Sequence, residues 1–177
     1  MHDSFVPPRS LRWGFLGLLA LYLILGVSYA AAVPVLEAPD ESSHLQVIRY
    51  IRLNRRLPPY QIPERRADSG AGMAWVIGYH DPPLYYAPPL YHALGAVLTA
   101  WTGMEDLPAR LIPSPSWEAG HAPQRGPESW NKNVFVHLPG ASLTQSQTVQ
   151  AAALLRAFSL LLGGVTIFCA YEIARML

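Results

Sequence analysis

The apolar run from Trp13 to Val33, WGFLGLLALYLILGVSYAAAV, decides the fold of this chain. It contains no charged residue, and a helix of about 20 such residues crosses a hydrocarbon core of about 30 Å. Arg9 and Arg12 precede the run. Because short basic segments stay on the cytoplasmic side of a membrane, these arginines predict a cytoplasmic tail over residues 1–12. We therefore expect a first transmembrane helix over residues 13–33.

The same run has a rival interpretation as a cleaved secretory signal. Small residues from Ser28 to Ala32 resemble a cleavage site, and basic residues precede the apolar segment. The apolar core of a signal peptide usually spans about 7–15 residues, however, and this one is longer. Its length favours a helix that stays in the membrane.

A second apolar run, from Ala151 to Ala174, predicts a second transmembrane helix. Its uncharged part, between Arg156 and Glu172, is shorter than a comfortable span of about 20 residues. The aliphatic stem of Arg156 can carry its charge to the interface, so a tilted or slightly short span is the best interpretation. The alternative is a buried helix of a soluble domain, but Gly163-Gly164 in the middle suits a membrane helix that packs against neighbours.

Composition agrees with a membrane protein. Apolar residues make up 51% of the chain and charged residues 14%, and the formal net charge of +1 gives no reason to expect a nucleic-acid partner. The single cysteine cannot form an internal disulfide. With two spans, residues 34–150 form one large extracytoplasmic loop and residues 175–177 lie at the cytoplasmic end. The expected fold is therefore an all-α membrane protein whose loop carries interfacial helices.

The loop begins with a charged stretch, EAPDESSH over residues 37–44, directly after the first span. Pro39 suits a first helical turn, and the acids after it suit the positive end of the helix dipole, which predicts an amphipathic helix over residues 39–56. At 100° per residue, Asp40 and His44 fall on its apolar face, spaced so that they can share a hydrogen bond. Because ionisable groups at a bilayer edge are costly, this position favours a function over a solvated helix start.

Arginines occupy the opposite face of this helix, at Arg49, Arg52 and Arg56. They fit contact with lipid phosphates or with a phosphorylated lipid substrate, for which the planar guanidinium fork is well suited. They fit equally well a solvated face, which is the usual role of a run of charges. The sequence leaves both interpretations open.

A second interfacial helix is expected over residues 84–101. The motif HDPPLYY at residues 80–86 leads into an apolar stretch that ends at Trp101. This stretch is too short to span a membrane, so it should lie along the interface or dip into it, with its tyrosines and Trp101 at headgroup level. Residues 103–133 are dense in Pro, Gly and Ser and predict a loop.

The chain carries no motif of the common soluble enzymes: it has no phosphate-binding glycine loop, metalloprotease helix, nucleophile elbow or paired-cysteine site. A carboxylate in a partly dry pocket can nevertheless take a proton from a substrate hydroxyl. No metal site and no cofactor are assigned, because the spacing of the ionisable residues matches no ligand pattern, although a divalent metal fits their chemistry. The ionisable residues of interest are Asp40, Glu41, His44, His80, Asp81, His92 and His137.

Several segments, in this order, resemble the start of the C-type (GT-C) integral-membrane glycosyltransferases. The likeness is to the bacterial branch that includes mannosyltransferase-like and aminoarabinose-transferase-like enzymes, and it covers most of the chain. The segments are APDESSH at 38–44 with Leu57-Pro58, HDPPLYY at 80–86, NKNVFVH at 131–137, and LRAFSLLLG at 155–163 with YEIAR at 171–175.

The resemblance implies an enzyme that takes a sugar from a polyprenyl-phosphate carrier and gives it to an acceptor on the non-cytoplasmic side of a bacterial inner membrane. It implies an acidic catalytic residue just after the first span, which matches Asp40 or Glu41. From the helical projection we prefer Asp40 as the general base. Glu41 would then be its partner or a metal-facing carboxylate, and His44 would orient the base.

The resemblance also implies substrate-binding residues. His80, Asp81 and Tyr85 would lie near the same cavity, and Arg156 would face the carrier phosphate. Members of the family have more than two membrane helices, so we expect the others to come from the rest of a longer protein or from another subunit. The alternative function is a non-catalytic two-span subunit or scaffold of a larger complex.

Overall fold

The computed structural model describes residues 9–58, 89–112, 114, 133–137 and 142–176. Within these ranges the chain forms helices and no β-strand, which confirms the expected all-helical class. The helices are α1 (Arg9–Ala32), α2 (Glu41–Asn54), α3 (Pro89–Leu98), α4 (Leu107–Arg110) and α6 (Gln147–Met176). The chain divides into a hairpin unit, residues 1–33 and 156–177, and an intervening unit, residues 34–155.

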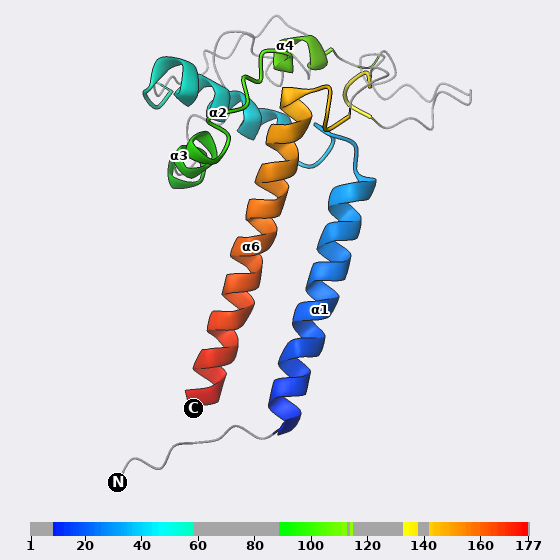
Figure 1. Cartoon of the computed structure of the whole chain (residues 1–177), viewed down its shortest axis with the longest axis vertical. Coiled ribbons are helices and arrows are strands. Elements are labelled where there is room, and N and C mark those ends of the chain that lie inside the picture. Colours follow the sequence, from blue (N-terminus) through cyan, green and yellow to red (C-terminus); the bar gives the residue numbers. More distant parts are fainter. Residues whose placement is uncertain (1–8, 59–88, 113, 115–132, 138–141, 177) are drawn as a thin grey trace, which may run out of the picture. The chain divides into compact units, whose positions relative to one another are not determined.

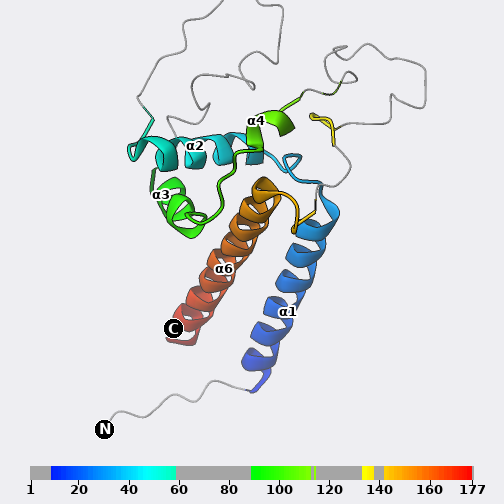
Figure 2. The same ribbon diagram turned by 45° about the horizontal axis from the view of Figure 1, so that its top comes forward.

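The hairpin unit consists of α1 and the part of α6 from Arg156 onward, which run antiparallel and side by side (Figures 1 and 2). Both helices are long and apolar enough to cross a membrane, over Leu11–Ala32 and Gln147–Met176. Most of their large apolar side chains are exposed, as expected where lipid is the surrounding solvent. The two candidate spans expected at 13–33 and 151–174 are therefore present as helices.

A close approach between the two helices depends on a glycine. A side chain at Gly163 would collide with the ring of Tyr22, so only glycine fits there. The Tyr22 hydroxyl donates a hydrogen bond to the carbonyl oxygen of Leu160, 3.0 Å away. Small residues at a helix interface and polar groups bonded within it are typical of membrane helix pairs, because an unpaired hydroxyl is costly in lipid.

The intervening unit is organised by the packing of α2 against α3, which lie side by side in both views (Figures 1 and 2). Gly95 allows this contact, because a Cβ there would lie 2.6 Å from Cδ1 of Ile48 and 3.0 Å from Cδ2 of Leu155. The core of the unit gathers side chains from each of its described helices and from the segments before α2, between α3 and α4, and between α4 and α6. Its members are Leu36, Leu45, Ile48, Ala96, Met104, Leu107, Leu111, Phe135, Ala151, Ala152 and Leu155.

The helix ends differ from those expected. Helix α2 begins at Glu41, two residues after Pro39, and stops at Asn54 because Arg55 adopts a left-handed conformation with φ 51°. Helix α3 stops at Leu98, three residues before Trp101, where the buried hydroxyl of Thr99 donates to the carbonyl oxygen of Gly95. Its expected first residues, 84–88, lie outside the described part of the chain.

Candidate functional site

Asp40 lies at the start of α2 but outside the helix. Its backbone is left-handed, with φ 59° and ψ 4°, and its side chain is exposed. The backbone is held there by bonds on both sides, from Glu41 N to Ala38 O at 3.1 Å and from His44 N to Asp40 O at 2.9 Å. Its carboxylate makes no capping bond to α2. The expectation that Asp40 belongs to the apolar face is therefore wrong, because the helix begins one residue later.

The neighbouring carboxylate has a different environment. Oε2 of Glu41 accepts a hydrogen bond from the backbone N–H of Leu36 at 2.7 Å. Leu36 is buried and has a positive φ of 75°, an unfavourable conformation for a leucine. Glu41 therefore supports the turn that leads from residue 34 into α2. Of the two acids, Asp40 is the one that faces solvent.

His44 points from α2 toward α3, where its Nδ1 lies 2.9 Å from Nε2 of His92. Tyr91 closes the cluster, with its ring edge-to-face on His44 at a centroid distance of 5.4 Å. His92 is buried and His44 is half-buried. Burial lowers the pKa of His44, and this effect exceeds the opposing attraction of Asp40 and Glu41, which raise it. His44 therefore pairs with His92 in place of the expected partner Asp40, and it is favoured in its neutral form.

The arginine face of α2 binds the chain that follows α3. Arg49 Nε donates to the carbonyl oxygen of Met104 at 3.1 Å. Arg52 donates through Nη1 to Thr102 O and through Nη2 to Ala100 O, the latter at 2.9 Å. Both interpretations from the sequence, phosphate contact and a solvated face, miss this internal role. Arg56 is exposed, as a solvated face requires.

Arg156, expected to face a carrier phosphate, contacts the backbone of the hairpin unit. Its Nη1 lies 2.7 Å from the carbonyl oxygens of both Ala30 and Val33, at the C-terminal end of α1. The last carbonyls of a helix have no partner within that helix and carry partial negative charge, so a guanidinium is well placed there. Arg156 thus caps α1.

Glu37 is a site residue that sequence reasoning missed. Its carboxylate, 8% exposed, accepts bonds from Val134 N at 2.8 Å, Phe135 N at 3.0 Å and His137 Nε2 at 2.9 Å. The residue stands in the charged stretch after the first span, but its partners follow about a hundred positions later. Local periodicity carries no signal for such a pair.

Asp106 forms a second missed cluster, at the start of α6. It accepts hydrogen bonds from Thr148 N at 3.0 Å, from Thr148 Oγ1 at 2.6 Å and from the hydroxyl of Ser146. Arg110 Nε adds a bond at 2.7 Å. Burial raises the pKa of the Asp106 carboxyl, but the bonds from Ser146, Thr148 and Arg110 outweigh burial and hold the pKa far below its ordinary value. Asp106 therefore acts as a charged N-terminal cap of α6.

The remaining expected residues, His80, Asp81 and Tyr85, lie outside the described residues. Within the described part of the chain, no three His, Cys, Asp or Glu side chains converge as a metal site requires. Of the expected site residues, Asp40, Glu41 and His44 lie together at the start of α2, where both carboxylates act on the pKa of His44.

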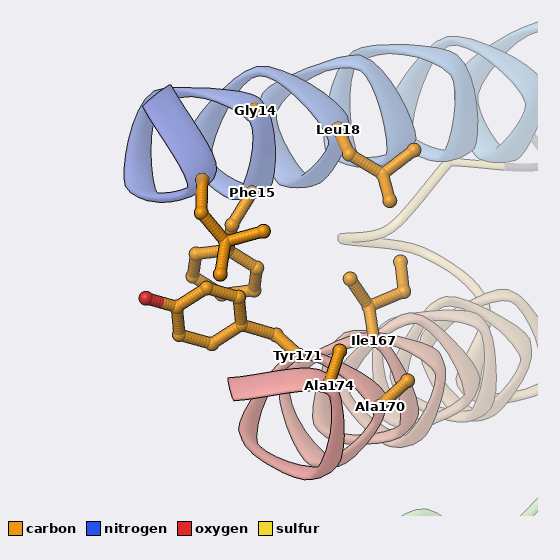
Figure 3. Close-up of a pocket in the computed structure, with 8 residues that line it drawn as sticks. Gly14, Phe15, Leu18, Ile167, Ala170, Tyr171 and Ala174 are labelled. Atoms are coloured by element: carbon orange, nitrogen blue, oxygen red, sulfur yellow. The ribbon is translucent and has the colours of Figure 1, made fainter. Parts of the chain in front are cut away.

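The hairpin unit also contains an apolar cavity of about 640 Å³ between α1 and α6. Figure 3 shows its lining: Phe15 and Leu18 of α1 face Ile167 and Tyr171 of α6. The rings of Phe15 and Tyr171 stack with centroids 4.3 Å apart. The lining offers hydrocarbon surface and the Tyr171 hydroxyl, and its eight residues include no carboxylate or imidazole.

Comparisons with protein-family models, with curated proteins and with solved structures found no match.

Proposed function

We propose that the chain is the N-terminal part of a membrane glycosyltransferase, with Asp40 as its general base. The enzyme moves a sugar from a polyprenyl-phosphate carrier to a hydroxyl acceptor on the non-cytoplasmic side of a bacterial inner membrane. The proposal rests on the resemblance of four segments to GT-C enzymes, together with one observation. Asp40 presents an exposed carboxylate, free of a capping bond, at the start of the first helix that follows a candidate membrane span ending at Ala32.

The backbone of Asp40 supports this assignment. A non-glycine residue with positive φ costs free energy, and such residues concentrate at functional sites. Aspartate tolerates the left-handed region better than most residues do, so the conformation alone does not require a function. In this conformation the carboxylate makes no bond to the N–H groups of α2, which a capping aspartate would normally bind.

The chemistry follows from the charges. Asp40 accepts the proton of the acceptor hydroxyl while the hydroxyl oxygen forms a bond to the anomeric carbon of the sugar. The bond between that carbon and the carrier phosphate oxygen breaks, and the phosphate leaves with the electron pair. His44 is a positioning residue in this scheme, because its imidazole is bonded to His92 and so fixes the start of α2.

The test compares sugar transfer from labelled polyprenyl-phosphate sugars in membranes of cells that express the protein from its own reading frame. Asp40→Asn is the informative variant, because asparagine also tolerates positive φ and keeps the shape while removing the base. Loss of a general base lowers the rate by about 10²–10⁴-fold. Glu105→Gln, at an exposed acid of the same unit, is the matched control. An Asp40→Asn rate equal to that of the control removes Asp40 as the base.

One observation favours the alternative of a non-catalytic subunit. Glu41, Arg49 and Arg52 all bind backbone groups of the intervening unit, so these charges hold the fold together. A scaffold needs such internal bonds and no base. It predicts no transfer by membranes that contain the wild-type protein, and co-purification with a larger membrane complex that is unchanged by Asp40→Asn.

A further inference from the structure

Helix α3 presents an apolar surface that the described residues of the intervening unit leave exposed. The exposed apolar side chains within α3 recur at positions i, i+4, i+7 and i+8, which places them within one stripe of the helix, and an exposed tryptophan follows the helix in the sequence. The opposite side, with His92, Gly95 and Ala96, is buried against the unit. We call the exposed stripe, together with the tryptophan after it, the α3 apolar face; its members are Leu90, Leu94, Val97 and Leu98 within α3 and Trp101 beyond its end, exposed by 69%, 42%, 74%, 40% and 68%.

We infer that the α3 apolar face lies in the headgroup region of the bilayer and points into lipid. The intervening unit is joined without a linker to both helices that are able to span a membrane, at Val33–Pro34 and within α6 at Leu155–Arg156. A unit tethered in this way stays at the membrane surface. No Asp, Glu, Lys or Arg occurs from Pro89 to Trp101. Tryptophan at one end of an apolar face is typical of interfacial anchoring.

The backbone carbonyls at and after the C-terminal end of α3 have hydrogen-bond partners within the protein. In water, the last carbonyls of a helix bond to solvent, but in lipid every backbone polar group needs a partner within the protein. Thr99 supplies two bonds to Gly95 O, from its backbone N at 2.9 Å and from its hydroxyl at 2.7 Å. Arg52 reaches over from α2 to the carbonyls of Ala100 and Thr102.

This arrangement gives Arg52 a positioning role. The planar guanidinium bonds two carbonyls at once, on either side of Trp101. The chain can therefore turn away from α3 while both carbonyls keep a hydrogen-bond partner within the protein. Through Arg52, α2 thereby holds α3 at a depth in the bilayer where the α3 apolar face meets hydrocarbon. The inference concerns how the unit sits on lipid, and it does not depend on the transfer chemistry proposed above.

Site-directed spin labelling tests the inference. In a Cys169→Ser background, a nitroxide is attached at Val97→Cys or Leu90→Cys in the full chain, reconstituted into phosphatidylcholine and phosphatidylglycerol vesicles. Collision rates with oxygen, which concentrates in lipid, and with a water-soluble nickel chelate report the surroundings of each label. Leu161→Cys, exposed on the candidate span, and Glu105→Cys, an exposed polar position, are the reference sites.

At both α3 labels, the expected ratio of oxygen to nickel collision rates is several-fold above the ratio at Glu105→Cys. It should lie closer to the ratio at Leu161→Cys than to the ratio at Glu105→Cys. A ratio equal to that at Glu105→Cys means that the face meets water and overturns the inference. Low collision rates with both reagents mean that protein covers the face, which also overturns it. A second comparison leaves the apolar side chains of the face unchanged: Arg52→Gln should raise nickel collisions at Val97→Cys, whereas Arg56→Gln, at an exposed arginine just after α2, should not.

Discussion

His44 and His92 contact each other through Nδ1 and Nε2, 2.9 Å apart, and so join α2 to α3 by a single hydrogen bond between two imidazoles. One of the two nitrogens must accept the bond, so at least one ring is deprotonated at the contact. If both rings were protonated, the two facing nitrogens would both be hydrogen-bond donors, and the two rings would both carry a positive charge. The junction between the two helices is thereby sensitive to acid.

We expect the protein to lose stability as the pH falls below the ordinary histidine pKa. Burial lowers the pKa of His44 below its ordinary value of 6.5, against the raising effects of Asp40 and Glu41. The unfolded chain then binds the proton more readily than the folded chain, so the free energy of unfolding decreases from about pH 6.5 downward until the lower folded pKa is passed. Melting followed by circular dichroism in detergent micelles, between about pH 8 and pH 5, measures this. His44→Asn should flatten the profile above the range in which carboxylates titrate, and an identical profile would contradict the assignment.

Arg156→Gln should destabilise the hairpin unit. The substitution removes the guanidinium that bonds Ala30 O and Val33 O. A hydrogen bond to a charged group contributes about 1.5–3 kcal/mol to stability. Thermal unfolding in lipid-free micelles provides the measurement, because a carrier phosphate is absent there. Arg175→Gln is the control, since Arg175 pairs with Glu172 near the helix end and is 40% exposed. Equal melting of the two variants would contradict the role of Arg156 in stabilising the end of α1.

Gly95→Ala should separate α2 from α3. The new methyl group would meet Cδ1 of Ile48 at 2.6 Å, and overpacking of this kind costs about 1–3 kcal/mol. Gly17→Ala is the matched control, because its Cβ meets nothing within 4 Å and alanine favours the helix. A melting temperature of Gly95→Ala at or above that of Gly17→Ala would show that the helices shift at little cost.

The two candidate spans were predictable because their signal is local. A long run without charge identifies each span, and residues elsewhere in the chain are not needed to recognise it. The amphipathic helix after the first span was also predictable, although its first residue was not. Pro39 fits a first helical turn as well as it fits the turn observed before Glu41, so the sequence did not decide where the helix begins, and the position of Asp40 depended on that.

The roles of the charged residues were not predictable. Arg52 bonds carbonyls about fifty positions away, and Asp106 caps a helix whose first residue is Gln147. Arg156 bonds the end of a helix more than a hundred positions earlier. Each of these side chains looks available for a ligand until the fold supplies a nearer partner. The sequence shows which charges exist, and tertiary structure decides which of them remain free to react.

Glu37 has a consequence for the order in which the intervening unit assembles. Its carboxylate closes on residues 97 to 100 positions later, so almost the whole segment must be made before these bonds form. Contacts of such long sequence separation slow folding, because the entropy of loop closure is lost before the contact stabilises the chain. During synthesis, the Glu37 carboxylate therefore lacks these partners until residues 134–137 have been made.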